Sequence, residues 1–217
     1  MTRLVISHYF PLMPSLLIAT SNQGKLNQMK EYLSGLDLIF LYLKDFDIKE
    51  SPDENGKTFE ENAVIKAKFY FAKTKIPVIA EDSGILVDAF PNELGVKTRR
   101  WGAGEKASDG EWIAYFLEKM KDFPKEKRAA KFQSCIALVG ENLEKIFHGE
   151  CSGVITETLE APIKEGIPLS SCFKPNGYDH VYSGLSLEKR MEVSHRGKAA
   201  KMLKGFLSEM NFCINYC

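Results

Sequence analysis

The stretch LLIATSNQGKLNQMKEYL, residues 16–33, constrains the fold most strongly because it changes from strand to helix within a few residues. Its first residues form an apolar run that is typical of a buried strand, and the residues from Gly24 onward follow helical spacing. The turn between them is polar and contains Thr20, Ser21, Asn22 and Lys25. A strand that passes through a tight turn into a helix favours a protein with helices packed on a sheet.

Strand-like and helical segments alternate along the rest of the chain. Strands are expected at 16–20, 37–43 and 76–84, a hairpin of two strands around 140–142, and helices at 24–34, 58–73, 109–121 and 194–210. The helix at 58 opens with the capping-box pattern Thr58 to Glu61. The order is not a regular βαβ series, so the sequence predicts a mixed α/β class.

Length and charge limit the kinds of partner. The 217 residues, 44% of them hydrophobic, are enough to bury the core of one domain, and no linker divides the chain. We therefore expect a single domain over 15–212, a loose extension over 1–14 and a short tail over 213–217. Lysine plus arginine number 29, as do aspartate plus glutamate, so no overall positive field favours duplex nucleic acid. A small anionic ligand needs only a local cluster of cations.

Cysteine usage and hydropathy indicate the compartment. The five cysteines are odd in number and form no C-x-x-C pair, which favours reduced thiols in a cytoplasmic protein. The first residues lack the apolar core and cleavage site of a signal peptide. No apolar run approaches the ~18 residues of a membrane span, so we expect no membrane association.

The polar turn of the first strand–helix unit has two interpretations. Ser21 or Asn22 caps the helix and Gly24 eases the corner, because short polar side chains satisfy the free N–H groups of a first turn. Alternatively, the hydroxyls, the amide and Lys25 add to the partial positive charge of the helix N-terminus and bind phosphate.

Three carboxylates are candidate metal ligands. Glu81 and Asp82 are adjacent at the expected end of a buried strand, with Ser83-Gly84 turning the chain, and Glu54 lies in an acidic loop. Adjacent acids repel unless a cation lies near them, and Mg²⁺ is usually held by one or two carboxylates, water and phosphate oxygens. The alternative is a solvated turn and a solvated loop.

Basic residues form a third group of candidates. Lys66 either extends past an apolar stripe of its helix or points into a cleft. Arg99 and Arg100 follow a glycine turn, and Ser194 is a natural cap for the last helix. His195 and Arg196 in the first turn oppose the helix dipole, which indicates that an anion is bound there.

Seven motifs occur in an order that resembles one family of enzymes. IATSNQGK, KTFEENAVIKA, IAEDSGILVDA, GVKTRRW, ASD, GVIT and SHRGKA, between Leu16 and Met210, resemble the inosine triphosphate pyrophosphatase family, which removes non-standard nucleoside triphosphates. The resemblance implies an elongated mixed sheet with helices on two lobes around a central cleft. It also implies a homodimer and Mg²⁺-dependent hydrolysis of inosine, xanthosine or deoxy triphosphates to the monophosphate and pyrophosphate.

The resemblance also implies roles for individual residues. Asp82 matches the proton acceptor, and Glu54 and Asp82, with Glu81 beside them, match the metal site. The predicted substrate contacts are Thr20, Ser21, Asn22, Lys25, Lys66, Ser83, Arg99, Arg190, His195 and Arg196. Arg190 stands where relatives have lysine, which keeps the charge and alters the donor geometry.

The base pocket departs from the family pattern. Relatives carry Phe-Gly-Tyr/Trp-Asp-Pro before the SHR motif, and NGYD at 176–179 resembles it. A gap-free alignment back from Ser194 instead matches GIPLSSCF, which predicts Ile167, Leu169 and Ser170 at the base. This change leaves two alternatives to the main function: a pyrophosphatase for other modified or pyrimidine nucleotides, and a nucleotide-binding module without turnover.

Overall fold

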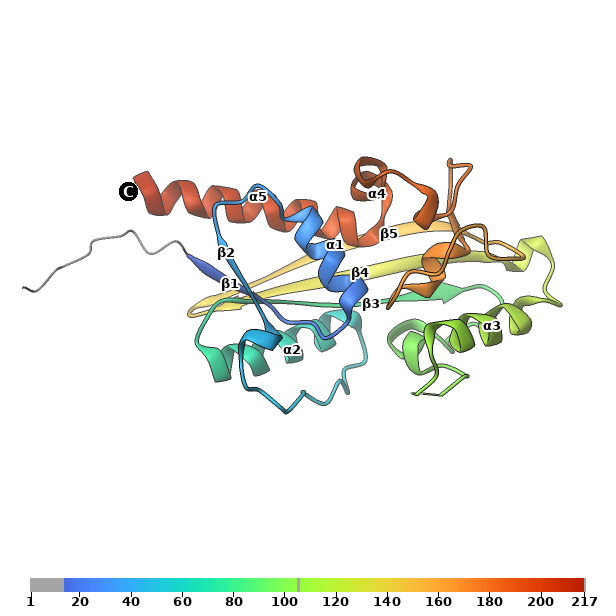
Figure 1. Ribbon diagram of the computed structural model, residues 1–217, viewed down its shortest axis with the longest axis horizontal. Helices are drawn as coiled ribbons and strands as arrows, with labels where there is room; N and C mark the ends of the chain where they lie inside the picture. Colours follow the sequence, from blue (N-terminus) through green and yellow to red (C-terminus); the bar gives the residue numbers. More distant parts are fainter. Residues whose placement is uncertain (1–13, 105, 217) are drawn as a thin grey trace, which may run out of the picture.

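A curved six-stranded sheet runs along the length of the molecule (Figure 1). The computed structural model describes residues 14–104 and 106–216, with only the backbone described over 211–216, so nearly all of the expected extension over 1–14 lies outside the described residues. The strand order is β2-β1-β3-β4-β5-β6, parallel between β2, β1 and β3 and antiparallel beyond β3. The strands are β1 Ser15–Ile18, β2 Ile39–Tyr42, β3 Val78–Val87, β4 Ala129–Gly140, β5 Leu143–Ile155 and β6 Phe173–Pro175.

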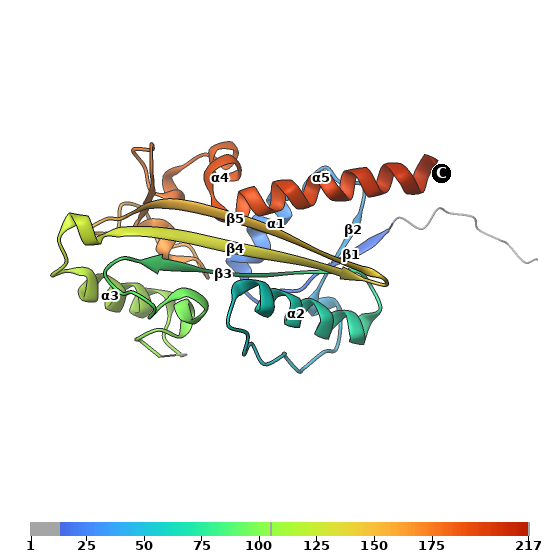
Figure 2. The ribbon, with the colours of Figure 1, turned by 180° about the vertical axis from the view of Figure 1, so that it is seen from behind.

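Both faces of the sheet are covered by helices, which explains the continuous apolar run of β1. Leu16 and Ile18 pack on one face with α1 and α5, whereas Leu17 packs on the other face with α2. Figures 1 and 2 show α5 along one face of β4 and β5 and α2 on the opposite side of the sheet. The helices are α1 Gln23–Tyr32, α2 Phe59–Thr74, α3 Asp109–Met120, α4 Leu187–Val193 and α5 His195–Tyr216.

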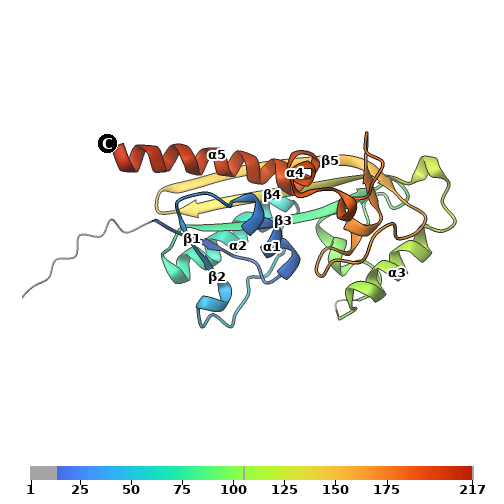
Figure 3. The same cartoon turned by 45° about the horizontal axis from the view of Figure 1, so that its top comes forward.

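A second lobe is built at the far end of the long strands. Its core joins α3 to the ends of β3, β4 and β5 and is rich in aromatic side chains, including Trp112, Phe116, Phe132 and Phe173. Figure 3 shows the segment between β5 and α4, drawn in orange, at the same end of the sheet as α3. The elongated mixed sheet with helices on two lobes confirms the predicted fold class.

The structure differs from the sequence-based elements in several places. The hairpin is confirmed, with Asn142 in the left-handed conformation between β4 and β5. The expectation that β3 ends at Ser83-Gly84 is wrong, because the strand continues to Val87 and stays paired with β4. Helix α5 runs past the expected end at residue 210 and into the predicted tail. Strand β6 and helix α4 were not expected, since both are too short to leave a periodic signal.

Two further observations concern helix capping and hydropathy. Thr58 caps α2 by accepting from the N–H of Glu61, but the Glu61 carboxylate accepts from the N–H of Lys57 rather than from Thr58, so only half of the capping box forms. Among the described residues, no helix is both long enough and apolar enough to cross a membrane.

Candidate active site

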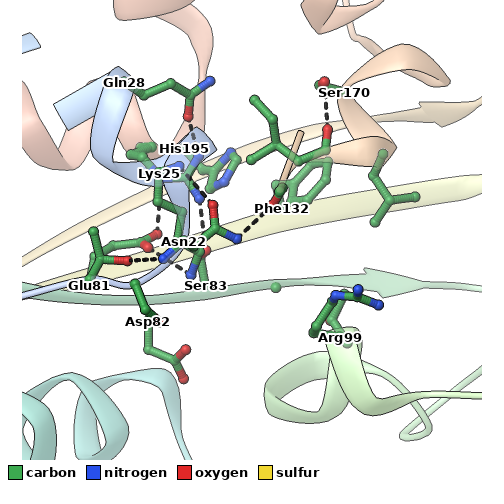
Figure 4. Close-up of a pocket in the computed structure, with 18 of the residues that line it drawn as sticks. Asn22, Lys25, Gln28, Glu81, Asp82, Ser83, Arg99, Phe132, Ser170 and His195 are labelled. Carbon is green, nitrogen blue, oxygen red and sulfur yellow. Dashed lines mark hydrogen bonds and ion pairs between the residues drawn. The ribbon is translucent and has the colours of Figure 1, made fainter. Parts of the chain in front are cut away.

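A cavity of about 400 Å³ lies between the two lobes, and residues on both sides of the middle of β3 line it (Figure 4). Its walls come from the start of α1, from β3, from the loop before α2, from the 3₁₀ segments and from the start of α5. All residues predicted to form the site line it, namely Thr20, Ser21, Asn22, Lys25, Glu54, Lys66, Glu81, Asp82, Ser83, Arg99, Ile167, Leu169, Ser170, Arg190, His195 and Arg196. Their individual roles stay predictions.

The turn before α1 is held by hydrogen bonds of its own side chains. Asn22 is the N-cap, and its Oδ1 accepts from the N–H of Lys25 at 2.9 Å. Its Nδ2 donates to the carbonyl of Gly166 at 2.9 Å, which ties the turn to the loop on the opposite wall of the cavity. The same loop packs so closely on position 24 that only glycine fits there, because a Cβ would lie 2.2 Å from the carbonyl oxygen of Glu165. Only the backbone N–H of Lys25 takes part in the cap, and its side chain lines the cavity.

Glu81 is the centre of a buried charge cluster. One carboxylate oxygen lies 2.8 Å from Lys25 Nζ, and the other accepts from Arg196 Nε at 3.2 Å and from Ser134 Oγ at 2.9 Å. Burial opposes ionisation of Glu81, but the charges of Arg196 and Lys25 outweigh it and hold the pKa of this carboxyl well below its usual range. The anion expected beside the cations at the start of the last helix is therefore supplied, at least in part, by Glu81.

Arg196 connects three elements around this carboxylate. Its Nη2 donates to Ser83 Oγ at 2.9 Å and its Nη1 donates to Gln28 Oε1. Because Gln28 is on α1 and Ser83 on β3, the guanidinium fixes the start of α5 against both. Gln28 also lines the cavity and was not anticipated from the sequence, where it is one polar residue among many on the helix.

Asp82 faces the opposite side of the sheet from Glu81. Successive side chains of an extended strand alternate between faces, and β3 is extended at this point. Figure 4 shows Glu81 pointing toward Lys25 and Asp82 pointing away from it, toward α2. The interpretation of Glu81 and Asp82 as a pair around one cation required a turn after Asp82, and the strand does not turn there.

The second carboxylate group forms around Lys66 on α2. Lys66 Nζ lies 3.1 Å from Glu54 Oε2 and 3.4 Å from Asp82 Oδ1, and Asn62 Nδ2 donates to Asp82 Oδ2 at 3.1 Å. Burial raises the pKa of Asp82. Burial opposes the charge on Lys66, but Asp82 and Glu54 outweigh it and raise the pKa of this amine. Two carboxylates that converge on one cationic group at the edge of the cavity are an arrangement suited to a divalent cation.

The wall opposite α1 carries the predicted base-pocket residues. Leu169 and Ser170 are buried in the 3₁₀ helix Pro168–Ser171, and Ser170 Oγ donates to the carbonyl of Ile167 at 2.7 Å. Asn176, Tyr178 and Asp179 of the NGYD segment are not among the described residues that line the cavity. The wall at 167–170 is therefore aliphatic and hydroxylic.

Aromatic side chains that the sequence did not single out also line the cavity. They are Tyr32, Tyr70, Trp112, Phe132 and Tyr182, and Phe132 stacks on His195 with ring centroids 4.6 Å apart. Burial lowers the pKa of His195 well below its usual value, so the imidazole is neutral. Trp112 Nε1 is buried and has no hydrogen-bond partner among the described residues. In the sequence, Trp112 and Phe132 are indistinguishable from ordinary core residues of a helix and a strand.

Arg99 and Arg190, two arginines of the predicted site, add to the cationic lining of the cavity. Arg99 is half exposed and its Nη2 donates to the carbonyl of Ala107 at 2.6 Å. Arg190 is more buried, lies 3.7 Å from Glu31 and has a buried Nε without a partner. Together with Lys25, Lys66 and Arg196 they place five cationic side chains around the cavity, and the last three are paired with the carboxylates of Glu54, Glu81 and Asp82.

Comparison with known proteins identifies the family of this chain. The family model described as the Ham1 family matches residues 16–206. The chain belongs to the Ham1 family. It is 37% identical over 192 residues to a dITP/XTP pyrophosphatase of Leptospira interrogans, covering 88% of this chain and 96% of that protein. It is also 37% identical to the dITP/XTP pyrophosphatase of Geobacter sulfurreducens over 196 residues, covering 90% of this chain and 97% of that one.

Solved structures of Ham1 proteins share the fold. A HAM1 protein from Coxiella burnetii is similar with a TM-score of 0.76 and 32% identity, covering 91% of this chain and 100% of that one. The Ham1 protein of Staphylococcus aureus gives a TM-score of 0.75 and 31% identity, covering 90% of this chain and 99% of that one. The resemblance indicated by the sequence motifs is confirmed.

Proposed function

We propose that this Ham1 protein hydrolyses non-standard nucleoside triphosphates, such as inosine or xanthosine triphosphate and their deoxy forms, to the monophosphate and pyrophosphate in a Mg²⁺-dependent reaction. The observation that carries the proposal is the cavity itself, where Lys25, ion-paired to Glu81, and the carboxylates of Glu54 and Asp82, which converge on Lys66, line one space. Two relatives at 37% identity are dITP/XTP pyrophosphatases, which supports the same reaction.

In this proposal some residues neutralise the charge of the triphosphate and one residue accepts a proton from water. Lys25, Arg196 and Lys66 neutralise the triphosphate and hold it in line, which is the main requirement of phosphoryl transfer. Glu54 and Asp82 would hold Mg²⁺, which when bound supplies further charge neutralisation at the phosphates. Asp82 orients a water molecule and accepts its proton, and a pKa raised by burial suits a carboxylate to that role. The anhydride bond between the α- and β-phosphates breaks, and pyrophosphate leaves.

The base lies, in our proposal, against the wall formed by Ile167, Leu169 and Ser170. Trp112 adds an aromatic ring to the same cavity, and its buried Nε1–H has no partner among the described residues. Because an unpaired buried donor disfavours a ligand that offers it no acceptor, we propose that the base presents an acceptor such as a carbonyl oxygen to this N–H. The aliphatic wall also favours a second candidate, a pyrophosphatase that accepts other modified or pyrimidine nucleotides.

A panel of standard and deaminated triphosphates with Mg²⁺ tests the proposal by the product released. We expect pyrophosphate and monophosphate from inosine and xanthosine triphosphates, loss of turnover in EDTA, and an inactive but folded Asp82→Asn variant. Release of orthophosphate, or near-normal activity of folded Asp82→Asn, would contradict the mechanism. Preferential hydrolysis of a pyrimidine triphosphate would favour the second candidate.

We also propose a homodimer in the cytoplasm. The dimer rests on the resemblance to the family, and the compartment is supported by the three cysteines of the described side chains, Cys135, Cys151 and Cys172, which are all buried free thiols. Light scattering of the purified protein tests the dimer, and localisation of a tagged chain tests the compartment.

A further inference from the structure

A second group of ligand-type side chains meets on the α2 side of the sheet, outside the cavity. Cys135 on β4 is directly opposite His148 on β5 in the antiparallel register, so both side chains lie on the same face. That face is the one on which α2 packs (Figure 2), and Glu60 belongs to the first turn of α2. The three residues come from three different elements, and only the tertiary fold brings them together.

The three donor atoms are close enough to share one metal ion. Cys135 Sγ, an imidazole nitrogen of His148 and a carboxylate oxygen of Glu60 lie within 4.8 Å of one another. His148 Nε2 is 3.2 Å from Glu60 Oε2. Among the described residues this is the one group of three or more Cys, His and acidic side chains that meets this spacing. Ligands of a tetrahedral ion at about 2.0–2.3 Å from the metal need only small rotamer changes to reach it from such positions.

Solvent reaches the group through a groove. Cys135 is buried, whereas the side chains of Glu60 and His148 are 52% and 63% exposed. All three line one groove together with Thr58 and Gln133. The buried thiol therefore lies at the base of the groove and the two exposed side chains lie at its rim, which gives an ion a path to all three donor atoms.

We propose that Glu60, Cys135 and His148 bind a borderline-soft transition metal ion such as Zn²⁺. Thiolate, imidazole and carboxylate are the donor set of zinc sites, and three protein ligands leave a fourth position for water. The same set disfavours Mg²⁺, which prefers oxygen ligands. This site is separate from the Glu54 and Asp82 pair, and it does not depend on the proposed hydrolysis.

The site is nevertheless linked to the cavity through the strand register and through α2. Asp82 is paired with Cys135 across β3 and β4. Helix α2 carries Glu60 as well as Asn62 and Lys66, which both contact Asp82. A bound ion would thus fix the first turn of the helix that positions the Asp82 carboxylate.

Titration of the full chain with Co²⁺, a spectroscopic substitute for Zn²⁺, tests the site without reference to activity. We expect one equivalent to bind with a thiolate-to-cobalt absorption band, and excess Mg²⁺ not to remove it. His148→Ala should weaken binding at least about tenfold, since even the loss of an outer partner of a metal ligand usually costs 10–100-fold. Cys135→Ser should abolish the thiolate band.

A matched variant separates this site from incidental binding. His180→Ala removes another exposed histidine that does not line the groove, and it should leave Co²⁺ affinity unchanged. Because His148 is exposed, His148→Ala should fold even if the buried Cys135→Ser variant does not. Equal Co²⁺ affinity in His148→Ala and the unchanged chain, or a thiolate band that survives in Cys135→Ser, would overturn the proposal.

Discussion

Replacing Arg196 with Met should destabilise the protein strongly, because it removes the main counter-ion of a buried carboxylate. The side chains of Arg196 and Glu81 are only 5% and 4% exposed, and Nε donates to Oε1 at 3.2 Å. Removing one partner of a buried ion pair costs about 3–5 kcal/mol, since the remaining charge stays desolvated. Lys25 Nζ still lies 2.8 Å from the other oxygen, so we expect the lower end of this range, about 3 kcal/mol.

Urea denaturation followed by circular dichroism measures this cost, and a thermal scan should show a fall in Tm of about 6–12 °C for a chain of this size. Arg99→Met is the matched control, because Arg99 is 49% exposed and lies 3.8 Å from Asp109. Because the Arg99 side chain is half exposed and its pair with Asp109 is long, this pair should contribute only about 0–1 kcal/mol, and the control should be nearly as stable as the unchanged protein.

The double variant Glu81→Gln/Arg196→Met tests the cause of the effect. If the cost arises from the unpaired charge on Glu81, the double variant should be more stable than the sum of the single variants predicts, by about 0.5–3 kcal/mol. Additive effects, or a loss below about 1 kcal/mol in Arg196→Met, would refute the view that Glu81 and Arg196 form a coupled buried pair.

Three further predictions follow from the walls of the cavity. Lys25→Ala should weaken binding of a triphosphate at least about tenfold and binding of the nucleoside little, because a charge-assisted contact is lost; equal losses in calorimetry would contradict a phosphate contact. Trp112→Phe keeps an aromatic ring but removes the unpaired Nε1–H. We expect kcat/KM to fall more for inosine triphosphate, whose base has a carbonyl oxygen in place of the adenine amino group, than for adenosine triphosphate. If the ratio of the two kcat/KM values does not change, Trp112 takes no part in base selection. Gly24→Ala places a Cβ 2.2 Å from the carbonyl oxygen of Glu165, so both Tm and substrate affinity should fall. An unchanged KM would show that the loop at 165–166 can move away without disturbing the substrate site.

The sequence motifs anticipated the composition of the cavity well. Short polar turns and helix starts are governed by hydrogen bonds between residues two to four positions apart, as in the cap that Asn22 forms for Lys25. Such turns and caps can therefore be predicted from the sequence without knowledge of the tertiary structure. The spacing from Ser194 predicts that residues 167–170 contact the base; the segment lies on the wall of the cavity, and its contact with a base stays a prediction.

Side-chain direction at the centre of the site required the fold. Glu81 and Asp82 are neighbours in the sequence but point to opposite faces, because pairing with β4 keeps β3 extended beyond the position where a turn was expected. Glu81 consequently meets Arg196, 115 residues away, and Asp82 meets Lys66. Nothing local to the two acids determines this separation.

The sequence by itself determined the alternation of elements, the helix caps, the hairpin and the kinds of charged group available, since each depends on contacts over a few residues. Only the tertiary structure decided which of those groups meet. Strand register and helix packing place Trp112 on the wall of the cavity. They also place Cys135 beside His148 and Glu60. Register is set by the burial of apolar side chains on both faces of the whole sheet, a property that no single segment carries.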